Sequence, residues 1–160
     1  MFTRHHAERT GTMRKKKYHP KAFESLGDIY TDAGGHKRTD TSANLYESML
    51  TSDAWKDLTM RQRVLYVACK GQYYGKRKPG KDFPDMEQVQ SDECFYMNAA
   101  AVERYGIYTK NMHREFYGDL KALCEHGFMS CLANGRATKS RSIYRFSAAW
   151  GAWKPEGQTK

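Results

Sequence analysis

The 160-residue sequence has no long apolar segment and no familiar catalytic motif. No run approaches the roughly 18–20 apolar residues that cross a bilayer, and the first residues carry charge without the apolar core of a secretory signal. We therefore expect a cytoplasmic protein without a membrane partner. No Ser/His/Asp set, carboxylate pair or phosphate-binding glycine loop stands out, so we expect no enzymatic activity and no cofactor.

Cysteine is scarce, and no two cysteines have the spacing of a metal-binding pair. The sequence holds Cys69, Cys94, Cys124 and Cys131, three of which sit beside apolar residues. This placement predicts small, reduced core side chains. Cys124-x-His126 followed by Cys131 is the nearest approach to a zinc motif, but it lacks the C-x2-4-C form, so we expect no metal.

Acidic residues are missing from much of the C-terminal part, and this absence localises the charge. No Asp or Glu occurs between Glu125 and Glu156. The net charge of +9 divides into +6 for residues 1–21, −2 for residues 22–129 and +5 for residues 130–160. Segregated positive charge indicates a polyanionic partner, either nucleic acid or an anionic membrane. The alternative is a solvated charge run that only keeps the protein soluble.

The length fits one domain with flexible tails, and a mean hydropathy of −0.86 is polar for a fully folded chain. We predict a disordered basic arm and linker over residues 1–43, one folded domain over residues 44–153 and a short tail over residues 154–160. Within the first segment, residues 22–30 have helical spacing, and residues 31–43 have linker composition.

The folded part is predicted to begin with helices. Residues 45–58 have near-helical apolar spacing, and Thr59 to Gln62 form a capping box that starts a helix reaching about Tyr73. The predicted inner face of this helix consists of Val64, Leu65, Val67, Ala68 and Gly71. Residues 75–92, with two prolines and many charges, predict a long loop.

Two further helices are predicted to flank a short glycine-containing turn. Asn98 is a suitable N-cap for a helix over residues 99–105, after a short extended segment at residues 95–97. Gly106 suits the left-handed position after it, and Thr109 is predicted to cap a second helix over about residues 110–126. This order is typical of a helix-turn-helix.

The second helix is predicted to have one apolar and one basic, aromatic face. The apolar stripe consists of Met112, Phe116, Leu120, Leu123 and Cys124. The opposite stripe consists of Lys110, His113, Arg114, Tyr117 and Lys121, with Asn111 at its edge and the acids Glu115 and Asp119 on a separate flank. Such donors suit the major groove of DNA. The alternative is an ordinary amphipathic helix with a solvated face.

A hairpin with a basic tip is predicted to follow. Residues 128–132 and 142–146 alternate as strands, and the turn between them carries Arg136, Lys139 and Arg141. A basic hairpin directly after a helix-turn-helix is a wing, which contacts phosphates or the minor groove. The alternative is a solvated hairpin tip.

The stretches FYMNAAAVERYGIYT, GDLKALCEHGFMSCL and SIYRFSAAW make the chain resemble winged helix-turn-helix proteins over residues 45–150. They are similar to replication-initiator-like and regulator-like proteins of Gram-positive plasmids and mobile elements. The resemblance implies a mainly α, α+β fold with a small β-hairpin, a recognition helix at 110–126 and a wing at 135–142. The insertion at 75–92 departs from the minimal fold.

Charge placement and resemblance together predict sequence-specific binding of double-stranded DNA, by a nucleoid-associated transcription regulator or replication protein. Predicted contacts are Lys110, Asn111, His113, Arg114, Tyr117, Lys121, Arg136, Lys139 and Arg141, with Arg14, Lys15, Lys16 and Lys17 of the arm. A homodimer through residues 22–30 or through Trp150 and Trp153 stays open. The alternatives are RNA binding and a protein-interaction adaptor using Tyr73, Tyr74 and Trp153.

Overall fold

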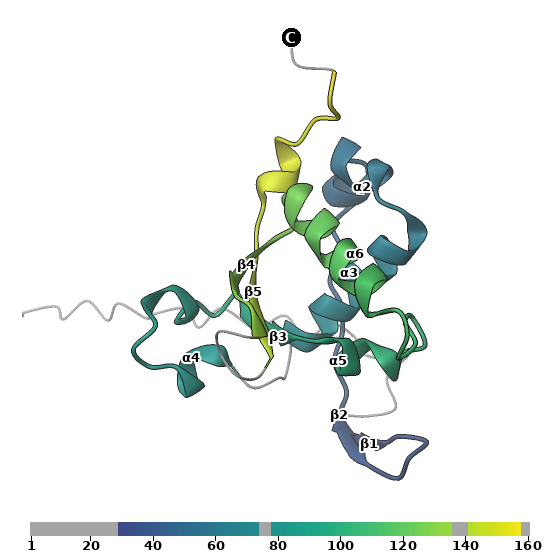
Figure 1. Cartoon of the computed structure of the whole chain (residues 1–160), viewed down its shortest axis with the longest axis vertical. Coiled ribbons are helices and arrows are strands. Elements are labelled where there is room, and N and C mark those ends of the chain that lie inside the picture. The colour runs from purple at the N-terminus through teal and green to yellow at the C-terminus, as the bar shows by residue number, and fades with distance from the viewer. Residues whose placement is uncertain (1–28, 74–77, 136–140, 158–160) are drawn as a thin grey trace, which may run out of the picture.

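The computed structural model describes residues 29–73, 78–135 and 141–157 (Figure 1). In these ranges the fold is α+β, as the sequence predicts. In chain order the elements are β1 (Ile29–Thr31), β2 (Lys37–Thr39), α1 (Glu47–Leu50), α2 (Asp53–Asp57), α3 (Met60–Tyr73), α4 (Pro79–Asp82), the 3-10 turn η1 (Glu87–Val89), β3 (Cys94–Met97), α5 (Ala99–Glu103), α6 (His113–Glu125), β4 (Met129–Ala133), β5 (Ser142–Phe146) and the 3-10 turn η2 (Ala149–Gly151). Within the described ranges, no helix is both long and apolar enough to cross a bilayer.

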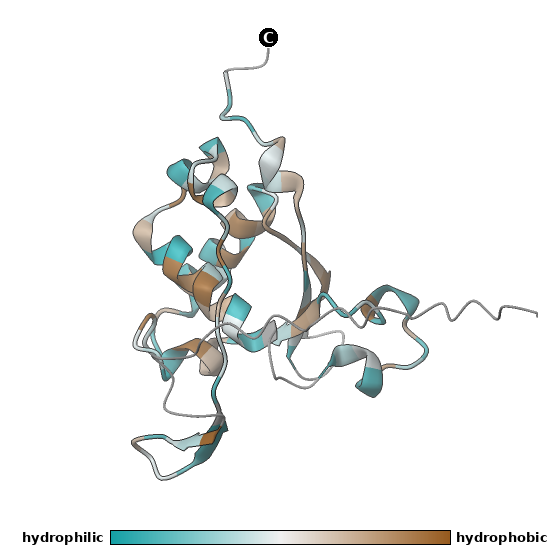
Figure 2. Cartoon of the chain, turned by 180° about the vertical axis from the view of Figure 1, so that it is seen from behind, coloured by the Kyte–Doolittle hydropathy of each residue, from teal (hydrophilic) through white to brown (hydrophobic). Residues whose placement is uncertain are grey.

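The main sheet has three antiparallel strands in the order β3-β5-β4. Strand alternation sends Phe95 and Tyr144, which pair across β3 and β5, into the core formed with α3 and α6. The intervening Tyr96 and Ile143 point to the other face and pack on Val89. Figure 2 shows the hydrophobic residues of these strands in brown. The sheet is therefore covered on both sides.

The segment that covers the second face of the sheet is the one predicted as a long loop over residues 75–92, and that prediction is wrong for its described part. The described part of that segment contains α4 and η1, and it buries Val89 completely, with Phe83 and Met86 partly buried beside it. The Tyr96 hydroxyl donates to Asp82 Oδ2 at 2.5 Å. Spaced apolar residues, which the prolines and charges obscure in the sequence, thus fold this segment onto the sheet.

Helix α3 begins with the capping box that the sequence predicts. The Thr59 backbone N–H donates to Gln62 Oε1 at 2.9 Å, and the Gln62 N–H donates to Thr59 Oγ1 at 3.3 Å. The predicted inner face is wrong in part, because Val64 and Val67 are 43% and 37% exposed. Tyr66, together with Leu65 and Cys69, takes the core side. The chain after β2 runs past the other side of α3 (Figure 2).

Residues 45–58 form two short helices instead of one. The hydroxyl of Ser52 accepts a hydrogen bond from the Trp55 N–H at 3.1 Å, which starts α2 afresh. Trp55 then contacts the rings of Tyr66 and Phe128 edge-on. A capping serine inside a helical pattern is thus the local reason for the break.

A small hairpin occupies part of the segment predicted as a linker. Strands β1 and β2 pair in antiparallel register, so Ile29 and Tyr30 are extended rather than helical. The Asp32 carboxylate closes the turn by accepting hydrogen bonds from the backbone N–H groups of residues 34 and 36 and from Arg38 Nε at 2.8 Å. Gly35 supplies the positive φ of 80° that the turn requires.

Candidate nucleic-acid interface

Around α5 the structure has two local features that the sequence predicts, a capping Asn98 before the helix and a left-handed Gly106 after it. The Asn98 side chain accepts a hydrogen bond from the Ala101 N–H at 3.1 Å, and α5 follows. Gly106, in the turn after α5, has a φ of 70°. This value lies in the left-handed region that glycine adopts after helices. The helix itself stops at Glu103, two residues earlier than predicted.

Helix α6 starts later than predicted, and this shifts two candidate contacts. The helix begins at His113, because the carbonyl of Thr109, not its side chain, closes a turn by accepting from the Met112 N–H at 3.0 Å. Lys110 and Asn111 therefore lie in the preceding turn, where both are exposed. They border the N-terminal end of α6 rather than forming its first turn.

A buried carboxylate connects α3, the turn and α6. Asp119 Oδ2 accepts from Arg61 Nε at 2.6 Å and from the Tyr108 hydroxyl at 2.7 Å, while Asp119 Oδ1 accepts from Gln62 Nε2 at 3.1 Å. The Tyr108 ring packs edge-on against Phe116 at 5.3 Å. We call Arg61, Gln62, Tyr108 and Asp119 the Asp119 cluster. It fixes the position of α6 against the rest of the domain.

The Asp119 cluster corrects the prediction that Glu115 and Asp119 share an exposed acidic flank. Glu115 is exposed, but the Asp119 side chain is only 8% exposed. Burial and the hydrogen bond to Asp119 raise the pKa of Tyr108 far above its ordinary value. A position three residues after the buried Phe116 belongs to the apolar side of a helix, and this spacing is the signal that could have identified Asp119.

The opposite face of α6 is solvent-exposed, as predicted. His113, Arg114, Tyr117 and Lys121 are all exposed, whereas Phe116, Leu120 and Leu123 are buried. His113 lies 3.6 Å from Glu103 of α5, and Lys121 lies 3.3 Å from Glu125. The structure thus brings these four side chains together on one helix face, next to Lys110 and Asn111.

Strands β4 and β5 form the predicted hairpin three residues after α6 ends. Directly before β5, toward the tip of this hairpin, the Arg141 guanidinium lies over the Tyr96 ring, 4.4 Å from the centroid. Arg136 and Lys139 of the predicted wing lie outside the described residues, as do Arg14, Lys15, Lys16 and Lys17 of the predicted arm. Of the three basic wing residues, Arg141 is thus the one within the described residues, and it contacts β3 through Tyr96.

His126 and Trp153 have structural positions at the end of α6. The His126 ring nitrogens lie 2.8 Å from the Ala122 carbonyl and 2.8 Å from Asp57 Oδ2. Trp153 stacks on the same imidazole at 4.4 Å. Both ring nitrogens are thus engaged by oxygen atoms. Among the described residues, no cluster of three or more His, Cys, Asp or Glu side chains could hold a metal ion.

Comparison with protein-family models, with curated proteins and with solved structures finds no match for this chain.

The described candidate residues lie in two places, the region of α6 and the start of β5. His113, Arg114, Tyr117 and Lys121 share one exposed helix face, and Lys110 and Asn111 precede it. Arg141, which directly precedes β5, contacts β3 because its guanidinium lies over the Tyr96 ring. Of the three aromatics of the adaptor alternative, Trp153 is half-buried and stacks on His126. The side chain of Tyr73 and all of Tyr74 lie outside the described residues.

Proposed function

We propose that this chain is a winged helix-turn-helix protein that binds double-stranded DNA sequence-specifically and without catalysis. It would serve as a transcription regulator or as a replication-initiation or accessory protein of a mobile element. Three features support the fold: the succession of α3, β3, α5 and α6, the hairpin that follows α6, and the strand order β3-β5-β4.

The observation that carries the function is the exposed face of α6. Its N-terminal half presents His113, Arg114 and Tyr117 to solvent, and the Asp119 cluster holds the helix from the opposite side. An arginine can donate two hydrogen bonds to guanine O6 and N7 in the major groove. A rigid helix that projects such a donor from a fixed position meets the geometric requirement for reading base edges.

The sharpest test separates base reading from backbone contact. A preferred site is first selected from a random duplex pool. Arg114→Ala is then expected to relax preference at one base pair by ~1–3 kcal/mol, whereas Lys139→Ala is expected to weaken all sequences alike. Lys56→Ala, a control at an exposed position of α2, should leave affinity unchanged. Failure to enrich any sequence, with weak binding of the whole pool, would refute the proposal.

The same titration reports stoichiometry. A homodimer binds two half-sites about one helical turn apart, so the selected sequence would be a two-fold repeat and the complex would contain two chains. A single half-site with one chain would indicate a monomer. Parallel titrations with single-stranded RNA address the other nucleic acid: tighter binding to RNA than to the selected duplex would favour RNA binding instead.

A further inference from the structure

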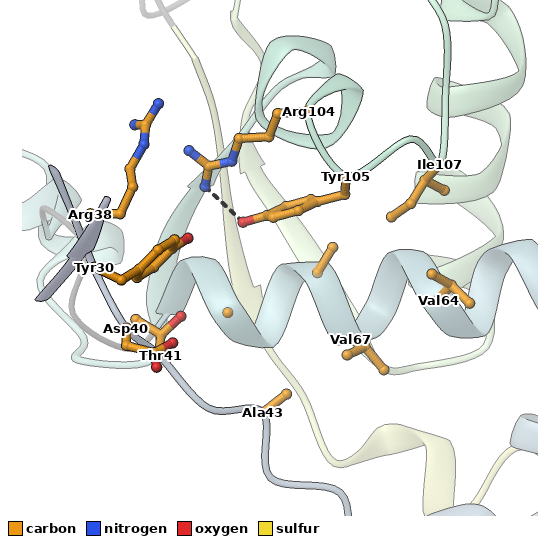
Figure 3. A pocket seen from close by; sticks show the side chains of 12 residues that line it. Tyr30, Arg38, Asp40, Thr41, Ala43, Val64, Val67, Arg104, Tyr105 and Ile107 are labelled. Carbon is orange, nitrogen blue, oxygen red and sulfur yellow. Dashed lines mark hydrogen bonds between the residues drawn. The ribbon is translucent and has the colours of Figure 1, made fainter. Parts of the chain in front are cut away.

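A groove lies beside the outer face of α3, away from the side that packs on the core (Figure 3). Val64, Val67 and Ala68 of α3 form its apolar floor, and Ile107 from the turn before α6 closes one end. Its volume is about 310 Å³, which falls in the range of small-molecule sites. Val64 and Val67 are the two α3 residues that the sequence predicts to face the core and that are exposed instead.

Two tyrosines and two arginines gather at the other end of the groove. Tyr30 and Arg38 come from the β1–β2 hairpin, while Arg104 and Tyr105 come from the turn that directly follows α5 (Figure 3). The same four residues line an adjoining hollow of about 270 Å³. The β1–β2 hairpin and the turn after α5, which are far apart in sequence, thus build a common site with one apolar end and one polar end. Asp40 also lines the polar end, and Asp32 pairs with Arg38 there.

Hydrogen bonds hold the side chains of this polar end in place before any ligand arrives. Arg38 Nε donates to Asp32 at 2.8 Å, and the other N–H groups of a guanidinium can still donate to an anion. The Tyr105 hydroxyl lies 2.7 Å from Arg104 and 3.2 Å from Gln72 Nε2. Because these side chains are fixed by neighbours, a ligand would lose little affinity to ordering them.

We propose that this groove binds a small ligand with a flat aromatic body and one anionic group. The carboxylate or phosphate would lie between Arg38 and Arg104, since a guanidinium group can donate paired hydrogen bonds to two oxygens of either group. The ring would stack beside Tyr30 and Tyr105 and lie over the apolar floor of α3. Aromatic carboxylates and nucleoside monophosphates share this chemistry.

The ligand site uses a different face of α3 from the one that carries the Asp119 cluster. Gln62 and Arg61 point to α6, whereas Val64 and Val67 line the groove. The proposal does not depend on DNA binding, and it is measured without DNA. Failure of one proposal therefore leaves the other unaffected.

The test is calorimetric titration of the full chain with two matched pairs of probes. One pair is 2-naphthoate and 2-naphthalenemethanol; the other is AMP and adenosine. We expect saturable 1:1 binding of at least one anionic probe. Its uncharged partner should bind with an affinity lower by roughly tenfold or more. Naphthoate binding alone would indicate an aromatic carboxylate ligand, and AMP binding alone would indicate a nucleotide. Absence of saturable binding by both anions, or equal binding of charged and uncharged probes, would overturn the proposal.

Three variants place the binding in the groove. Arg104→Gln should weaken the anionic probe roughly tenfold, and Arg145→Gln, at an exposed arginine of β5, should not. Gly71 lines the groove, so Gly71→Leu keeps every charge but fills the groove. The backbone tolerates this side chain, because a Cβ there would meet only Thr41 Oγ1, at 3.7 Å. Gly71→Leu should abolish probe binding while circular dichroism stays unchanged. Equal losses in Arg104→Gln and Arg145→Gln would overturn the assignment.

A second copy of the chain is the competing occupant of an exposed apolar face. Sedimentation of the probe-free protein distinguishes it. If the protein is a dimer that Gly71→Leu dissociates, and if no probe binds, the groove is a self-association surface. That result would overturn the ligand proposal. A sedimentation coefficient that Gly71→Leu leaves unchanged, combined with probe binding that it abolishes, supports a ligand site.

Discussion

Replacement of Asp119 by asparagine should destabilise the domain, although the two side chains have nearly the same shape. Asp119 accepts three hydrogen bonds, and an asparagine has only one carbonyl oxygen to accept them. If that oxygen stays with Arg61 and Tyr108, the new NH2 group faces the NH2 group of Gln62. Rotation of the Gln62 amide would relieve this clash, but it would remove the acceptor for the Thr59 N–H and break the capping box of α3.

The cost follows from burial. A lost hydrogen bond to a buried charged group is worth ~1.5–3 kcal/mol, and a buried donor without a partner costs ~1–3 kcal/mol. The Arg61 side chain is 40% exposed, so water replaces much of its lost ion pair. We therefore expect Asp119→Asn to lower the free energy of unfolding by ~2–4 kcal/mol, below the upper range for breaking a fully buried pair.

Urea unfolding at pH 7 measures this cost. With an m-value of ~2 kcal/mol/M, the midpoint should fall by ~1–2 M at unchanged m. The control is Asp53→Asn, because Asp53 pairs with Lys154 at 2.6 Å but its side chain is 45% exposed. That substitution should cost less than ~1 kcal/mol. Equal small losses in the two variants would refute the structural role assigned to the Asp119 cluster.

Three further predictions concern glycine, cysteine and tyrosine. Gly127→Ala should cost more than ~2 kcal/mol in thermal melts, because φ is 78° and a Cβ would lie 2.6 Å from the backbone of η2; Gly118→Ala, in open space on α6, should instead add ~0.5–1 kcal/mol. Iodoacetamide at pH 8 should modify the exposed Cys131 well before Cys124, since burial raises the pKa of Cys124 to about 11; equal rates by mass spectrometry would contradict this. Burial raises the pKa of Tyr108 in the folded chain. The stability that Tyr108 contributes is therefore complete below pH ~10. It falls as the pH rises further, because the Tyr108 hydroxyl then ionises in the unfolded chain only. The urea midpoint should therefore drop less between pH 9 and 11 in Tyr108→Phe, and an identical drop would count against it.

Local signals in the sequence predict much of the α5–α6 region. Asn98 caps α5 and Gly106 takes a positive φ because each conformation depends on a few neighbouring residues. The capping box at Thr59 is equally local. Strand alternation likewise predicts the hairpin of β4 and β5. The exposed face of α6 follows from helical periodicity once the helix itself is known.

The features that the sequence does not predict depend on contacts between distant segments. Asp119 is buried only because Arg61 and Tyr108 reach it from other elements. Helix α3 has apolar residues on two sides, so periodicity alone cannot decide that Leu65 rather than Val64 faces the core. The groove is likewise invisible in the sequence, because its two arginines are distant along the chain and lie on different elements.

Binding of duplex DNA through α6 is tested most directly by fluorescence anisotropy over a range of salt concentrations. For six to eight neutralised phosphates, the slope of log K against log salt should be on the order of −5 to −7. Lys121→Ala, which removes one exposed cation from α6, should reduce the magnitude of that slope by about 1, and Lys56→Ala should leave it unchanged. A slope near zero for the unmodified chain, or identical slopes for all three proteins, would contradict DNA binding through this helix.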